Sequence, residues 1–169
     1  MSSRLLARAA VYAALYAALT LAPGLNGVAY GQVQFRVSEG LLAFACADPA
    51  AVPGLAVGTA LANIASPMGV VDVVVGAALT LLAAALMWGL GPHAWALAAP
   101  VVVNGFGVAG ELTWLQHLPY WPSVSLVALG EAVVMATLGA LLLIVVRRYG
   151  GALGLSSAGR RGTRPGRRT

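Results

Sequence analysis

The sequence predicts an all-α integral membrane protein, folded as a bundle of six transmembrane helices. Apolar residues make up 60% of the 169 residues, and charged residues make up only 9%. A soluble domain usually carries about 25% charged residues. The mean hydropathy of +0.86 also exceeds what a water-exposed surface allows. A surface with so few charges is suited to lipid.

Six apolar segments are separated by proline, glycine or polar residues, and we expect each segment to be a helix. They cover about residues 5–22, 38–48, 51–65, 70–90, 94–111 and 124–146. Proline and glycine end helices, and they follow most of these segments. A bilayer core about 30 Å thick requires about 20 helical residues. The second and third segments are therefore short, and we expect them to be tilted, broken or extended into their loops.

The distribution of arginine predicts the topology. Arginines lie at both ends of the chain, and Arg36 is the only one between positions 9 and 146. Arginine-rich flanks stay in the cytoplasm, and six crossings place both termini on one side. We therefore expect a membrane domain over residues 1–149 in the cell membrane, with both termini cytoplasmic. Residues 150–169 are expected to form a disordered Arg-rich cytoplasmic tail. The loops expected outside cover residues 23–37, 66–70 and 112–122.

Polar side chains inside the apolar segments are the candidates for function, because an ionisable group at mid-membrane costs about 2.5–3.5 kcal/mol on insertion scales. The candidates are Glu39, Asn63, Asp72, Asn104, Glu111 and Glu131. In a six-span arrangement they converge on the outer half of the bundle. Glu131 is the deepest, about 10 Å from the start of the sixth helix at 1.5 Å per residue. Asp48, beside Pro49, is expected on the inner side as a helix cap.

Each of these residues also has a structural interpretation. An acid at the outer end of a helix can be interfacial and solvated, and a buried Asn can join two helices. Arg36 and Glu39 are three residues apart and can form a salt bridge at a helix start. Depth removes the solvation explanation for Glu131.

The motifs of several protein classes are missing. The sequence contains no H-E-x-x-H, G-x-S-x-G or phosphate-binding loop, so we expect no enzyme activity, no ATP hydrolysis and no metal or cofactor site. The basic residues are not interleaved with aromatic residues, which argues against nucleic-acid binding. Cys46 is the only cysteine, so an intrachain disulfide is impossible.

Small residues form a second pattern. Ala9, Ala13 and Ala17 lie on one stripe of the first helix, with Ala10, Ala14 and Ala18 beside it. The third segment carries Gly54 and Gly58. Small residues four apart allow helices to approach closely in lipid, although an alanine-rich chain also produces this spacing by chance.

The chain resembles the QueT family of queuosine-precursor transporters, which are substrate-binding S components of energy-coupling factor (ECF) importers. The resemblance covers about residues 5–148 and follows the order of the family. Val75 stands where the family usually has an aromatic residue. The segments that carry the resemblance are Gln34-Phe35-Arg36-Val37-Ser38-Glu39, Ala51-Val52-Pro53-Gly54-Leu55, Ala62-Asn63, Asp72-Val73-Val74 with Gly76, Ala99-Pro100, Val103-Asn104 and Leu129-Gly130-Glu131.

The resemblance implies a six-helix S component that docks on a membrane T component powered by two ATPases. The alanine stripes of the first helix would face the T component. The ligand would be a 7-deazaguanine such as preQ0, preQ1 or queuine, whose N–H groups suit carboxylate and amide oxygens. Trp114 or Trp121 would stack on its flat ring. The substrate-binding candidates are Arg36, Glu39, Asn63, Asp72, Asn104, Glu111, Trp114 and Glu131.

Two other functions fit the residues. One is an S component for another small nutrient, such as a different base or a vitamin. The other is a structural membrane protein whose acids are only interfacial. Ligand binding distinguishes the three.

Overall fold

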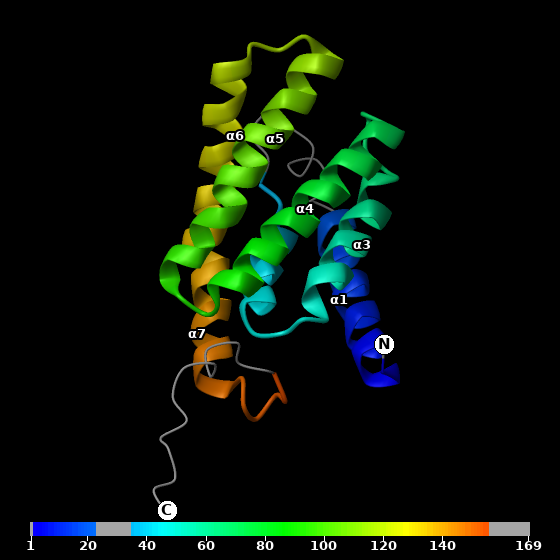
Figure 1. Cartoon of the computed structure of the whole chain (residues 1–169). Coiled ribbons are helices and arrows are strands. Elements are labelled where there is room, and N and C mark those ends of the chain that lie inside the picture. Colours follow the sequence, from blue (N-terminus) through cyan, green and yellow to red (C-terminus); the bar gives the residue numbers. More distant parts are fainter. Residues whose placement is uncertain (1, 23–34, 156–169) are drawn as a thin grey trace, which may run out of the picture.

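A computed structural model describes residues 2–22 and 35–155, and within these ranges every regular element is a helix (Figure 1). This confirms the all-α prediction. The 3₁₀ helix η2 runs directly into α5, and α6, the π-helical turn η3 and α7 form one continuous helix. The elements are α1 (Ser3–Leu21), η1 (Val37–Cys46), α3 (Ala51–Asn63), α4 (Val70–Leu90), η2 (Ala94–Leu97), α5 (Ala98–Gln116), α6 (Tyr120–Val134), η3 (Met135–Gly139) and α7 (Ala140–Tyr149).

Four of the expected six spans are long and apolar enough to cross a membrane. They are Ser3–Leu21, Val70–Leu90, Ala94–Gln116 and Tyr120–Tyr149. The other two helices correct the six-span prediction, because η1 has 10 residues and α3 has 13. At about 2.0 Å per 3₁₀ residue and 1.5 Å per α residue, each extends only about 20 Å. Neither reaches across a core of about 30 Å.

The short helix η1 is buried at the centre of the bundle. It packs against α1, α3, α4, α6 and α7. Because helices surround η1 and eight of its ten residues are buried, it faces protein rather than lipid and does not need the length of a span. Its buried residues are Ser38, Glu39, Gly40, Leu41, Leu42, Ala43, Ala45 and Cys46.

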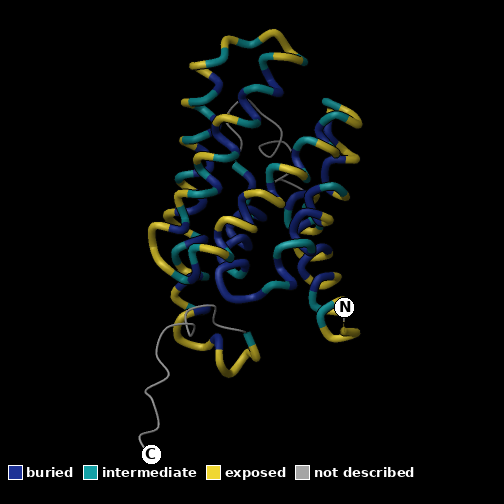
Figure 2. Tube along the Cα trace, viewed as in Figure 1, coloured by how far each residue is buried: buried dark blue, intermediate teal, exposed yellow. Residues whose placement is uncertain are grey.

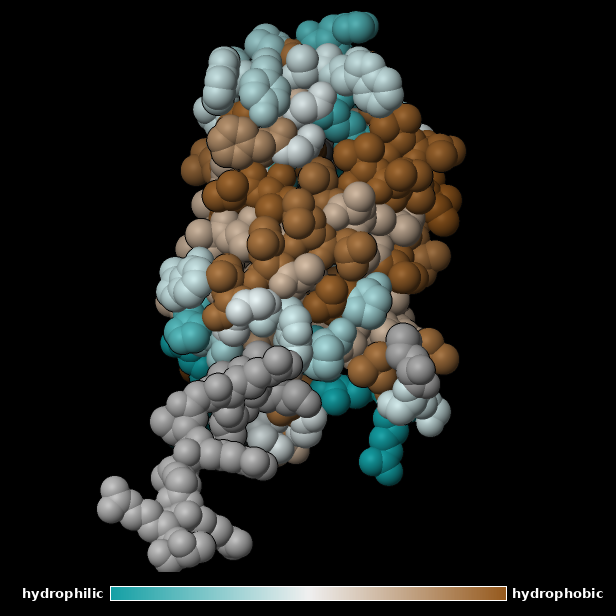
Figure 3. All heavy atoms as spheres, in the orientation of Figure 1, coloured by the Kyte–Doolittle hydropathy of each residue, from teal (hydrophilic) through white to brown (hydrophobic). Residues whose placement is uncertain are grey.

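The outer surface is apolar around the middle of the bundle. Figure 3 shows hydrophobic residues across the middle and more polar residues toward both ends, and Figure 2 shows the exposed residues along the outer faces of the helices. This is the surface that a bilayer requires. Large apolar side chains exposed on it include Leu6, Val11, Val74, Leu82, Val102, Leu129, Leu141 and Ile144.

Helices α1 and α3 approach each other through small residues. A Cβ at Gly54 would lie 2.6 Å from the Ala9 carbonyl oxygen, and a Cβ at Gly58 would lie 2.8 Å from that of Ala13. Ala9 and Ala13 are therefore buried inside the protein, and Ala17 is half-buried. The neighbouring stripe of Ala10, Ala14 and Ala18 is exposed.

The loop expected over residues 112–122 is wrong for most of its length, because these residues are largely helical. Helix α5 continues to Gln116 and α6 begins at Tyr120, so only three residues connect them. His117 ends α5 in the left-handed conformation, with φ of 56°. Pro122 is the third residue of α6, where a backbone N–H has no intrahelical acceptor and a proline is tolerated.

The two ends of the described chain lie at the same end of the bundle, opposite the α5–α6 connection (Figure 1). An even number of crossings requires this arrangement. Most of the expected outer loop (residues 23–34) and of the expected disordered tail (residues 156–169) lies outside the described residues.

Candidate ligand-binding site

Seven of the eight predicted substrate-binding residues gather inside the bundle. They come from η1, α3, α4, α5 and α6 and from the residue before η1, and each residue is at most 6% exposed. Trp114 is the exception, because it is 68% exposed on the outside of α5. The seven gathered residues are Arg36, Glu39, Asn63, Asp72, Asn104, Glu111 and Glu131.

Part of this cluster encloses a small cavity. The space available to a water molecule in this cavity is ≈ 10 Å³. This is room for about one water. The cavity is lined by Arg36, Glu39, Gly76, Leu79, Thr80, Asn104, Val108, Val127 and Glu131.

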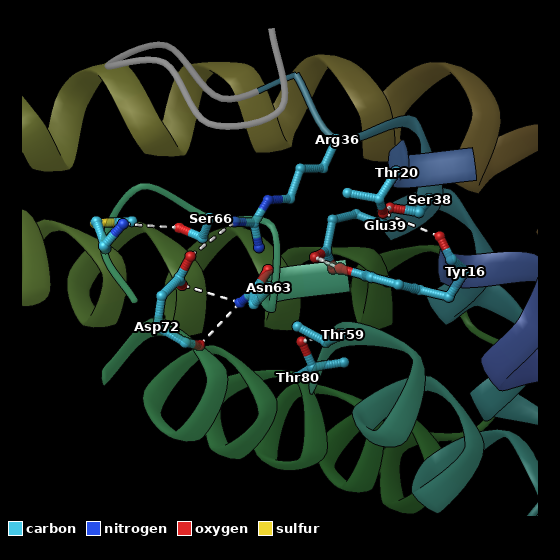
Figure 4. A network of polar contacts seen from close by, with 11 residues as sticks. Tyr16, Thr20, Arg36, Ser38, Glu39, Thr59, Asn63, Ser66, Asp72 and Thr80 are labelled. Atoms are coloured by element: carbon cyan, nitrogen blue, oxygen red, sulfur yellow. Dashed lines mark hydrogen bonds and ion pairs between the residues drawn. The ribbon is translucent and has the colours of Figure 1, made fainter. Parts of the chain in front are cut away.

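We call Glu39, Asn104 and Glu131 the Glu39 group. The Tyr16 hydroxyl donates a hydrogen bond to Glu39 Oε1 (Figure 4). The Asn104 side chain interacts with the carboxyl groups of both Glu39 and Glu131. Among the described residues, Glu39 Oε2 and Glu131 Oε1 have no hydrogen-bond partner. The group therefore presents two free acceptors.

We call Asn63, Asp72 and Glu111 the Asp72 group. Asn63 Nδ2 donates to the Asp72 backbone carbonyl at 2.8 Å and to Asp72 Oδ1 at 2.9 Å (Figure 4). Arg36 Nη2 lies 3.7 Å from Asp72 Oδ2, which is an ion pair but not a hydrogen bond. Within the described residues, Asn63 Oδ1, Asp72 Oδ2 and both Glu111 oxygens lack a hydrogen-bond partner.

The two groups together define what the site can bind. Six buried oxygens lack a donor among the described residues, and all six are carboxyl or amide oxygens. A buried acceptor without a partner costs about 1–3 kcal/mol, more when it is charged. Four carboxyl groups share the cluster with one guanidinium. This arrangement is suited to a ligand that carries several N–H donors and no negative charge.

Hydroxyl groups near the site were not among the residues predicted from the sequence. Tyr16 is fully buried against Glu39, and Thr80 lines the cavity and accepts a hydrogen bond of 3.0 Å from Thr59. The sequence does hold a signal for Thr80, since it is the only hydroxyl residue in residues 70–90. Tyr16 lies in an Ala/Leu segment, where a tyrosine is also an ordinary apolar residue.

Asp48 lies outside the site, as expected. Its Oδ1 accepts a hydrogen bond of 3.0 Å from the Ala50 N–H. Ala50 is the N-cap of α3 and no side chain caps that helix, so the expected capping role of Asp48 is wrong. Its Oδ2 lies 2.6 Å from Arg8 and accepts a hydrogen bond of 2.8 Å from the Tyr12 hydroxyl. These contacts join α1 to the start of α3.

Gly76 makes the Asn63–Asp72 contact possible, and Gly76→Ala should disrupt it. The added Cβ would collide with Asn63 Nδ2 and lie 3.1 Å from Asp72 Oδ1. We expect a loss of about 1–3 kcal/mol in unfolding free energy, measured as a lower Tm of the detergent-purified protein. Gly89→Ala on the same helix is the control, because its Cβ meets nothing within 4 Å. Equal Tm values for the two variants would contradict this interpretation of Gly76.

The fold and the site define an all-helical membrane protein with a cluster of buried polar side chains inside its bundle. The sequence profile of the QueT transporter family matches residues 6–148, and the chain belongs to that family. The chain is therefore a membrane transport protein, and the resemblance stated from its motifs is confirmed.

A curated relative supports the same family. The Queuosine precursor transporter QueT of Lactococcus lactis subsp. cremoris (strain MG1363) is 32% identical over 136 residues, which cover 72% of this chain and 80% of the relative. No solved structure matches the chain significantly.

Proposed function

We propose that this protein is the substrate-binding S component of an ECF importer, and that it captures a 7-deazaguanine queuosine precursor from outside the cell for ATP-driven uptake. The observation that carries the ligand class is the set of six buried acceptor oxygens without donors among the described residues. Family membership and the name of the Lactococcus relative support the same ligand class.

A 7-deazaguanine has the hydrogen-bonding groups that such a site needs. Its N1–H and exocyclic amine lie side by side, so one carboxylate can accept both hydrogens in a paired contact. We assign this contact to Glu131, with Asn104 and Glu39 beside it. Glu131 is the twelfth residue of α6, about 17 Å from the start of the helix at 1.5 Å per residue. It is buried, so bulk water does not solvate it.

The chain lacks a phosphate-binding loop, so we assign the energy source to partner proteins: a T component and two ATPases. We assign the docking face to the alanine stripes of α1. Ala10, Ala14 and Ala18 are exposed and can contact the T component directly. Ala9 and Ala13 hold α3 close beside that face, and Ala17, on the same stripe as these two, is half-buried.

Thermal unfolding of the purified chain with a panel of ligands tests the proposed function. We expect 7-deazaguanines to raise the Tm and purines and vitamins to leave it unchanged. A shift with a vitamin or another base alone would identify an S component for a different nutrient. A chain that responds to none of the ligands would contradict a role in substrate binding.

Both termini are expected in the cytoplasm, because the arginines of residues 4, 8, 147 and 148 flank the ends of the bundle. Reporter fusions at residues 2 and 169, active on only one side of the membrane, measure this directly. An external signal from either fusion would overturn the topology.

A further inference from the structure

Among the described residues, Glu111 is the acid of the site whose two carboxyl oxygens both lack a hydrogen-bond partner. It is 4% exposed. The other site acids each have a partner: Tyr16 donates to Glu39, Asn63 donates to Asp72, and Asn104 interacts with Glu131. A carboxyl group buried in this way is expensive unless a donor or a cation accompanies it.

The position of Glu111 places it beside the cavity. Asn104 and Val108 line the cavity from α5. Glu111 is seven residues after Asn104, which puts it on the same face of the helix, two turns further along. Its carboxyl group interacts electrostatically with Asp72 and Arg36. Glu111 is therefore the next polar group of α5 beyond the cavity, on the side of the Asp72 group.

These contacts give the site two ends that differ in their number of free acceptor oxygens. The Glu39 group has two free acceptor oxygens around a cavity of ≈ 10 Å³. The Asp72 group has four free acceptor oxygens, one of which belongs to the neutral Asn63 amide. Arg36 lines the cavity and also pairs with Asp72. One guanidinium cannot neutralise both carboxylates of the Asp72 group.

We propose that Glu111, together with Asp72, binds a positively charged amino group of the ligand, while the Glu39 group binds the guanine-like edge. This inference rests on the proposed function and extends it: among 7-deazaguanines, the site selects those that carry a protonated amine on the 7-substituent. An ammonium has three donors and a full charge, and the Asp72 group supplies several acceptors and excess negative charge.

The first test compares two ligands on the unmodified protein, so it does not depend on a variant that folds. The probes are 7-aminomethyl-7-deazaguanine, which is a cation at neutral pH, and 7-cyano-7-deazaguanine, which is neutral. Isothermal titration should give a Kd about tenfold to a hundredfold lower for the aminomethyl compound, because hydrogen bonds to charged groups are the stronger ones. Equal affinities, or tighter binding of the nitrile, would overturn the inference.

The second test locates the selectivity. Glu111→Gln keeps the size of the side chain and removes its charge, and it should reduce the affinity ratio of the two probes by about tenfold or more. Glu131→Gln is the matched variant in the Glu39 group. It should weaken both probes by a similar factor and keep their ratio. A ratio unchanged by Glu111→Gln would contradict the assignment, provided that the Tm of the variant shows a folded protein.

The outcomes also separate this inference from the proposed function. Binding of both 7-deazaguanines without preference retains the proposed function and rejects the amine subsite. Binding of neither probe, with a Tm shift from another nutrient, rejects the proposed ligand class and with it the amine subsite.

Discussion

Glu131→Gln should lower the affinity for a 7-deazaguanine about tenfold to a hundredfold. Glutamine keeps the shape of the side chain but replaces one acceptor oxygen by an N–H₂ donor. At least one ligand N–H would then face another N–H, and a buried donor without a partner costs about 1–3 kcal/mol. The fold should survive, because a neutral amide is easier to bury than a carboxylate. Isothermal titration with 7-aminomethyl-7-deazaguanine measures the change.

The control for this experiment lies on the same helix. Ser125 is exposed, and its hydroxyl donates only to the Trp121 carbonyl at 3.1 Å, so Ser125→Ala should bind the ligand like the unmodified protein. Wild-type affinity in Glu131→Gln would remove Glu131 from the site. An unfolded variant would show that Glu131 supports the bundle rather than the ligand.

Tryptophan should destabilise the fold at Ala13 but not at the neighbouring Ala14 of α1. Ala13 is 6% exposed, and its backbone already lies within 3.0 Å of where a Cβ at Gly58 would be. Ala13→Trp therefore has no room for an indole between α1 and α3, and we expect it to destabilise the protein by about 3 kcal/mol or more. Ala14 is exposed, so Ala14→Trp should fold normally and bind the ligand.

The same pair tests the proposed docking face. In liposomes that contain a T component, both ATPases and ATP, Ala14→Trp should abolish uptake, because the indole would hold the helices of the two proteins apart. Liposomes with this chain and ATP alone serve as the baseline, and they should show no uptake. Full uptake by Ala14→Trp would mean that this stripe of α1 faces lipid.

The polar residues of the site could be predicted because of their cost in lipid. Glu39, Asn63, Asp72 and Asn104 interrupt otherwise apolar segments, and an expensive group in such a place must face protein, water or a ligand. Their positions relative to the expected helix ends predicted that they would gather in the outer half of the bundle. The structure gathers all of the predicted acids and amides, and it places Glu131 deeper along its helix than expected because α6 begins four residues earlier than predicted.

Other features of the fold depend on contacts between helices, and the spacing of residues in the sequence does not predict those contacts. Trp114 was expected in the loop over residues 112–122. Proline is tolerated in the first turn of a helix, so α6 includes Pro122, and Trp114 and Trp121 both lie in helices. The two alanine stripes look alike in sequence. Only the position of α3 decides that Ala13 is buried and Ala14 is not. The length of η1 likewise reflects its burial on every side.

The small size of the cavity has a kinetic consequence. The proposed bicyclic ligand needs more room than ≈ 10 Å³, so we expect the described arrangement to exchange with a wider one before capture. The apparent Kd is then the intrinsic Kd divided by the fraction of molecules in the wider state. Association should be slower than the roughly 10⁵–10⁷ M⁻¹s⁻¹ usual for docking onto an open surface, and it should reach a plateau at high ligand concentration. The plateau rate would report how often the helices separate.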